Sequence, residues 1–80
     1  MKVLRRKFKN NEFGENIEGS EEKVIEEINV AGYRELIEFE KMLANISGQT
    51  LNVRYDRGKF ECIVLADRKK HECEYVTIIG

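Results

Sequence analysis

Five basic side chains stand close together at the start of the chain, and their type and spacing could bind phosphate groups. Residues 1 to 9 carry a local charge of +5 without any acid, whereas residues 10 to 49 carry ten glutamates and a charge of −7. In a strand these bases alternate sides, so Arg6 and Phe8 point away from the others. A basic sheet surface with aromatic rings can hold a nucleic-acid strand. With one later arginine, the nucleic-acid candidates are Arg5, Lys7, Lys9 and Arg54.

Internal neutralisation is the competing interpretation of this basic segment. The sequence pI is about 5.9, and the chain contains no known nucleic-acid-binding signature. If an acidic strand lies beside residues 2 to 9, opposite charges across the ladder contribute roughly 0.2 to 1 kcal/mol each. We favour this neutralised or solvated edge over a nucleic-acid surface.

Metal binding and catalysis have little support in the residue pattern. Cys62, His71 and Cys73 are types that bind zinc, but no fourth ligand is indicated and no CxxC spacing occurs. The only histidine adjoins a charged turn, and no serine or cysteine has a base at a recognised motif spacing. No phosphate-binding loop is present. We therefore expect no metal, no cofactor and no enzymatic activity.

The positioning elements are clearest near the C-terminus, where three runs of β-branched and aromatic residues alternate with turn signals. They predict an antiparallel meander over residues 51–55, 60–66 and 71–79. Placing Tyr55 opposite Phe60 aligns Leu51 with Val64, and a four-residue connection then sets Val64 opposite Cys73 and Cys62 opposite Tyr75. The predicted core face is Leu51, Val53, Tyr55, Phe60, Cys62, Val64, Ala66, Cys73 and Tyr75.

A helix from Tyr33 to Ile46 is predicted to cover that face, with Gly48 ending it. Its core stripe is predicted to be Leu36, Phe39, Leu43 and Ile46. A second apolar patch, made of Tyr33, Ile37 and Ala44, projects away from this stripe. Either a partner or second copy buries that patch, or the segment from Asn10 to Gly19 folds over it with Phe13 and Ile17.

Residues 21 to 30 fit either a helix or a strand. A continuous helix over residues 21–46 would be about 39 Å long and would contain Gly32 at its middle. We favour a strand from Lys23 to Val30, followed by a turn at Ala31-Gly32. The predicted fold is α+β, an antiparallel sheet of four to five strands against one main helix, in the order β-β-α-β-β-β, with β-α-β-β-β as the alternative.

Eighty residues make one small domain, residues 1 to 80. No apolar run approaches the roughly 18 residues of a membrane span, and the two cysteines are too few for a disulfide framework, so we expect a cytoplasmic protein without membrane contact. The stretch INVAGYRELIEFEKML resembles strand-to-helix entries in small proteins of bacterial phages and mobile elements. This resemblance covers a fifth of the chain and implies no activity.

The function that we expect is non-catalytic binding of another protein, as a cytosolic regulator, adaptor or inhibitor. An acidic surface on the helix side would steer the partner, and apolar anchors would supply affinity. The candidate contact residues are Tyr33, Ile37, Glu38, Glu40 and Ala44. Nucleic-acid binding through the basic strand is the alternative function, and a structural component of a larger or self-associating assembly, including a homodimer, is the third.

Overall fold

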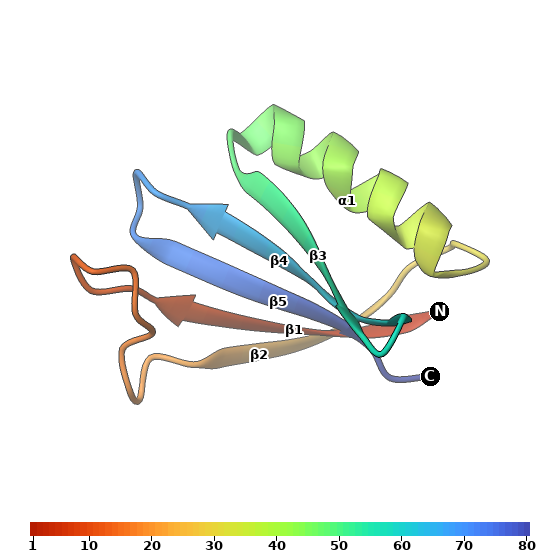
Figure 1. The fold of residues 1–80 in the computed structure, drawn as a ribbon, viewed down its shortest axis with the longest axis horizontal. Coiled ribbons are helices and arrows are strands. Elements are labelled where there is room, and N and C mark those ends of the chain that lie inside the picture. Colours follow the sequence, from red (N-terminus) through yellow and green to blue (C-terminus); the bar gives the residue numbers. More distant parts are fainter.

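The computed structural model describes all 80 residues, which form one five-stranded antiparallel sheet with a helix packed against it (Figure 1). The elements in chain order are β1 (Lys2–Lys9), β2 (Glu22–Glu27), α1 (Tyr33–Ser47), β3 (Thr50–Asp56), β4 (Lys59–Asp67) and β5 (Glu72–Ile78). This confirms the predicted α+β fold and its β-β-α-β-β-β order. The ambiguous segment forms a strand, as favoured, but this strand ends at Glu27 and not at Val30.

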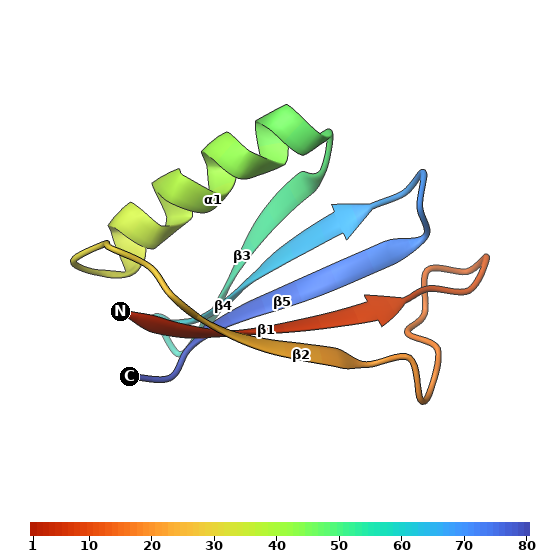
Figure 2. The same ribbon diagram turned by 180° about the vertical axis from the view of Figure 1, so that it is seen from behind.

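The strand order across the sheet is β2-β1-β5-β4-β3, so the two ends of the chain pair at its centre. Lys2 forms two backbone hydrogen bonds with the last two residues: its amide donates to the Gly80 carbonyl at 3.1 Å, and its carbonyl accepts from the Ile79 amide at 3.0 Å. Figure 2 shows the two termini at the same end of the sheet. The β1 strand, which carries the N-terminal bases, is therefore an interior strand.

Pairing between β1 and β2 neutralises only part of the basic segment. Lys7 lies opposite Glu22, as expected for a basic strand beside an acidic one. Arg6, however, lies opposite Lys23, so a base faces a base at this position. Whether a base of β1 meets an acid on β2 therefore depends on the face of the sheet to which its side chain points.

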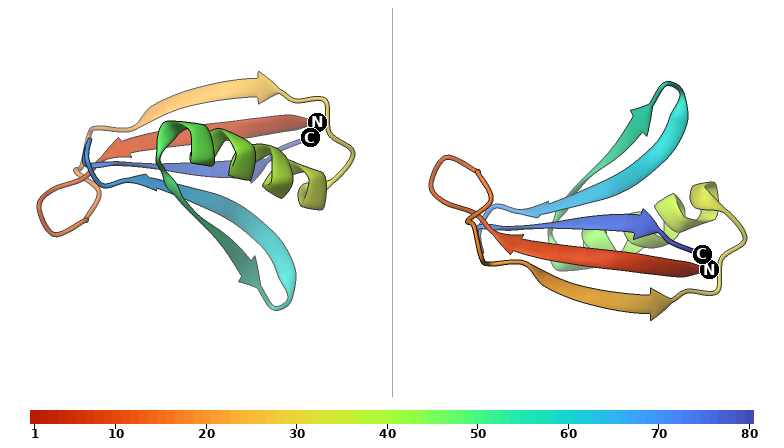
Figure 3. Two further views of the ribbon diagram at one scale, coloured as in Figure 1. Left: turned by 90° about the horizontal axis from the view of Figure 1, so that it is seen from above. Right: turned by 90° about the horizontal axis from the view of Figure 1, so that it is seen from below.

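The helix begins and ends where the sequence predicts. Glu35 in its first turn accepts a 2.8 Å hydrogen bond from the Ala31 amide, and Gly48 follows its last turn with φ at 74°. That left-handed conformation favours glycine, because other residues meet a steric penalty there. Figure 3 shows α1 on one face of the sheet and no helix on the other, which we call the open face.

The strand register differs from the prediction because β4 contains a bulge. Tyr55 lies opposite Phe60 as predicted, but the next pair joins Arg54 to Cys62 and leaves Glu61 unpaired. One extra residue reverses the alternation of all residues that follow it. Leu51 consequently lies opposite Leu65 rather than Val64.

Because of the bulge, part of the predicted core face lies on the opposite side of the sheet. Ile63 and Leu65 are buried under α1, while the open face receives Cys62, Val64, Ala66, Cys73 and Tyr75. On β5, Val64 pairs with Tyr75, so the predicted pairs Val64/Cys73 and Cys62/Tyr75 are wrong. The buried core cluster is Val3, Ile28, Leu36, Ala44, Ile63, Leu65 and Val76.

The loop between β1 and β2 does not cover the helix. It lies against the open face, where Asn16 Nδ2 donates a 3.2 Å hydrogen bond to the Tyr75 hydroxyl. Phe13 is 79% exposed and Ile17 is 44% exposed, so neither packs against α1. The alternative in which Asn10 to Gly19 folds over the helix is therefore wrong.

Candidate functional site

An ion-pair cluster centred on Arg5 lies between α1 and the sheet. The guanidinium hydrogen-bonds three carboxylates from three elements: Glu26 on β2, Glu40 on α1 and Glu74 on β5. The contact with Glu40 uses both of its oxygens, and Nη2 lies 3.0 Å from Oε2. The Glu40 side chain is fully buried, and that of Arg5 is only 13% exposed. This cluster joins the helix to three adjacent strands, β2, β1 and β5.

The Arg5 cluster removes two predicted contact residues from the surface. Burial opposes the charged guanidinium, but the hydrogen bonds of Glu40, Glu26 and Glu74 outweigh it and raise the pKa of Arg5. Arg5 is therefore a structural cation and is not available to a phosphate. Glu40 is likewise unavailable to a protein partner, so both assignments are corrected. The strand alternation placed Arg5 and Arg6 on opposite sides, but it did not show that Arg5 faces α1 or that Glu40 is its partner.

The Arg5–Glu40 pair also sets which side of α1 faces the sheet. Leu36 and Ala44 are buried on the same stripe as Glu40, and Ile37 packs against the core. Tyr33 stacks on Phe60 with ring centroids 5.2 Å apart. The predicted second patch of Tyr33, Ile37 and Ala44 is therefore part of the inward side. Glu38 is the only one of the five protein-binding candidates that is exposed.

The exposed apolar residues of α1 include two from the predicted core stripe, Leu43 and Ile46. Leu43 is 39% exposed, Met42 is 54% exposed and Ile46 is 79% exposed. Phe39 lies three or four residues from two of them and is half-buried. We call Phe39, Met42, Leu43 and Ile46 the helix flank. The sequence pattern did not indicate the helix flank, because the predicted core stripe contained only apolar residues and left out Glu40, which is buried.

Two glutamates border the helix flank. Glu35 precedes Phe39 by four residues, and Glu38 precedes Met42 by four, so each lies one helical turn from a flank residue. Both glutamates are exposed, and Glu38 lies 4.0 Å from Lys41. The helix flank is thus an apolar surface with an acidic border.

The open face carries arginines that have no carboxylate partner. The central cross-strand row runs from β2 to β3 through Lys23, Arg6, Tyr75, Val64 and Asn52. Arg6 and Arg54 take part in none of the ion pairs of the chain. Their guanidinium carbons lie 5.4 and 5.7 Å from the centre of the Tyr75 ring. Phe8 meets Tyr75 edge to face at 5.7 Å.

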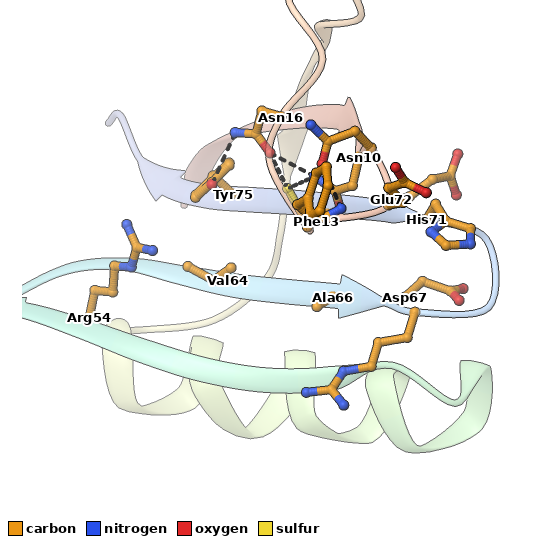
Figure 4. A pocket seen from close by; sticks show the side chains of 15 residues that line it. Asn10, Phe13, Asn16, Arg54, Val64, Ala66, Asp67, His71, Glu72 and Tyr75 are labelled. Carbon is orange, nitrogen blue, oxygen red and sulfur yellow. Dashed lines mark hydrogen bonds between the residues drawn. The ribbon is translucent and has the colours of Figure 1, made fainter.

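A hollow of about 530 Å³ lies on the open face between the β1–β2 loop and the strands. Figure 4 shows Val64 and Ala66 along its floor, Arg54 at one end, and Glu72 and His71 at the other. Phe13 of the loop forms part of its wall. No sequence pattern indicated this hollow, because its walls come from segments far apart in the chain.

The two cysteines also lie on the open face, apart from each other. Cys73 lies opposite Ala66, and Cys62 precedes Ala66 by four residues on β4, so the two cysteines are not paired across the strands. Both thiols are free. The Cys73 thiol donates to Asn16 Oδ1 at 2.9 Å, while burial and the nearby Glu61 charge raise the pKa of the Cys62 thiol. No group of three or more metal-binding side chains occurs in the structure.

The remaining basic candidates are divided between the two faces. Lys7 is half-buried, and its Nζ lies 4.0 Å from Glu72 Oε1, while Lys9 is exposed at the end of β1. Arg54 is exposed on the open face. Of the four nucleic-acid candidates, only Arg54 therefore joins the aromatic group around Tyr75.

The sequence matches no protein-family profile, and neither a curated protein nor a solved structure is similar to it. The resemblance of INVAGYRELIEFEKML to phage and mobile-element proteins stays a prediction. The chain has no helix with the length and apolar character needed to cross a bilayer.

Proposed function

We propose that this chain is a non-catalytic module that binds another protein through the helix flank and acts as a cytoplasmic regulator, adaptor or inhibitor. The exposure of Met42, Leu43 and Ile46 on a helix that already buries its other side carries the proposal. Such a patch has no role in the core of the chain, and contact with a partner would remove it from water.

The charges around the flank specify the kind of partner. Glu35 and Glu38 border it, so a protein that presents apolar residues within a basic rim complements its charge. In a symmetric homodimer through this surface, the glutamates of the two copies would face each other, and their like charges would repel. Two free cysteines fit the reducing cytoplasm. Arg5 and Glu40 contribute indirectly, because they hold the flank outward.

The test compares two lysine substitutions at exposed positions on opposite faces of the molecule. Ile46→Lys removes an apolar contact from the flank and adds a charge that a basic rim repels, whereas Asn52→Lys adds the same charge on the open face. The wild-type chain and the Asn52→Lys control should capture the same protein from host lysate, and Ile46→Lys should lose it. The captured protein is then purified and its association rate is measured, and Glu38→Lys should lower that rate. Equal capture by all three chains would refute the helix-flank assignment.

A further inference from the structure

The open face contains two arginines, Arg6 and Arg54, that form no ion pair within this chain. Arg6 faces Lys23 across the ladder, and Arg54 lies opposite Cys62, so neither has a carboxylate in its pair. The neighbouring rows also carry no acid, because Leu4 lies opposite Thr77, and Phe8 lies opposite Cys73, which in turn pairs with Ala66. The helix side differs, because there Arg5 meets three glutamates. The fold thus separates one satisfied arginine from two that retain their capacity to bind an anion.

The aromatic rings around these arginines add a second recognition element. Arg6 and Arg54 both lie over Tyr75, and Phe8 packs against the same ring. A guanidinium over a ring gains cation–π energy and keeps N–H groups free to contact phosphate oxygens. Aromatic faces beside such cations are where unpaired bases stack in single-strand-binding proteins.

The hollow next to Tyr75 supplies room for a base. Its volume of about 530 Å³ lies within the usual range of ligand pockets, roughly 300 to 1,000 Å³. Phe13 is 79% exposed on its wall and presents a ring with no packing role in the core. Asp67 and His71 line the end of the hollow away from Arg54.

We propose that the open face binds single-stranded nucleic acid, with Arg6 and Arg54 contacting phosphates and Phe13 and Tyr75 stacking against a base in the hollow. A duplex does not fit this arrangement, because its bases are already stacked on one another. The site lies on the other side of the sheet from α1, so it is independent of the helix flank and adds a function to the proposed one.

Fluorescence anisotropy with labelled oligothymidylate and oligouridylate of about 12 nucleotides tests the proposal. Binding to one or both single strands is expected at low salt, and the tighter of the two identifies the preferred sugar. Two phosphate contacts predict that log K falls with log salt with a slope of roughly −1.4. A duplex of the same length should bind more weakly than the single strands.

Matched variants assign the binding to the open face. Arg6→Ala and Arg54→Ala should each weaken binding about fivefold or more, or about 1 kcal/mol. Arg34→Ala removes the same charge from exposed α1 and should leave binding unchanged, as should Ile46→Lys. Thermal melts that match wild type show that each variant is folded, and the exposed Arg54 carries the test if Arg6→Ala does not fold.

Three results would overturn the proposal. The first is no anisotropy change up to about 1 mM protein at low salt, the limit of weak binding. The second is an equal loss in Arg34→Ala and Arg54→Ala, which would show unspecific attraction. The third is duplex binding as tight as single-strand binding. None of these results bears on the helix flank, so the two proposals fail separately.

Discussion

Arg5 and Arg6 are adjacent in the chain, yet the fold uses them in opposite ways. Arg5 points toward α1, where its guanidinium is bound by Glu26, Glu40 and Glu74 and is largely removed from water. Arg6 points to the open face, where it lies over Tyr75 and has no carboxylate partner. Successive side chains of a strand point to opposite faces, so one step along β1 separates a charge that stabilises the fold from a charge that a ligand can use.

This difference explains the uneven charge along the sequence. The acidic middle segment supplies Glu26 and Glu40, which form ion pairs with Arg5 and neutralise its charge on the helix side. The open face receives bases from β1, β2 and β3 without matching acids in its central row. Internal pairing and two differently charged faces are therefore both present, one on each side of the sheet.

The strongest test of the comparison removes each arginine in turn. Arg5→Ala should lower the free energy of unfolding by about 3 to 5 kcal/mol, because it leaves Glu40 buried without its partner. Arg6→Ala should lower it by less than about 1 kcal/mol. Urea denaturation of the two variants measures both values. Similar losses would show that the two faces do not differ in this way.

The orientation of α1 can be tested by enlarging one residue on each side of it. Ala44 is 3% exposed in the core, so Ala44→Leu should overpack it and cost about 1 to 3 kcal/mol. Ile46 is 79% exposed, so Ile46→Phe should change stability by less than about 0.5 kcal/mol. Thermal melting measures both effects. A larger loss at Ile46 would mean that the helix flank faces the core.

The loop that walls the hollow should depend on Asn16. Asn16→Ala removes hydrogen bonds to the Tyr75 hydroxyl and the Cys73 thiol, and we expect a loss of about 0.5 to 1.5 kcal/mol. Cys73 should also react faster with a thiol reagent, since Asn16 packs over it. Glu18→Ala, on the same loop and exposed, is the control and should leave both properties unchanged. Unchanged Cys73 reactivity in Asn16→Ala would argue against this loop position.

The smallest expected effect concerns the Cys62 thiol. Because burial raises its pKa, less thiolate is present at a given pH than for an ordinary cysteine, whose pKa is about 8.5. Alkylation of Cys62 should therefore rise with a midpoint above that value, and mass-spectrometric peptide mapping can follow it separately from Cys73. A midpoint below 8.5 would instead indicate that Arg6 and Arg54 dominate the field on the open face.

The sequence predicted those parts of the fold that depend on local pattern. Turn residues and alternation located the strands, and Gly48 located the end of α1. Two features depended on contacts between distant residues and were missed. The bulge at Glu61 reversed the faces of β4, although no residue type signals it, and the buried Glu40 rotated α1 relative to a stripe that counted only apolar positions. The helix flank and the hollow follow from these two features.

The central claim is that Arg5 is held in the fold and Arg6 is not, and the side-chain Nε–Hε signals of the two arginines test it most directly in a ¹H–¹⁵N correlation spectrum at neutral pH. Arg5 Nε donates to Glu26 at 3.0 Å within a largely buried cluster, so its Hε should exchange slowly with water. The Hε of Arg6 should exchange with water quickly, so that its signal is broadened or absent. The account is supported if Arg5 alone is protected and Glu40→Gln weakens that protection. Equal exchange of the two arginines would contradict it.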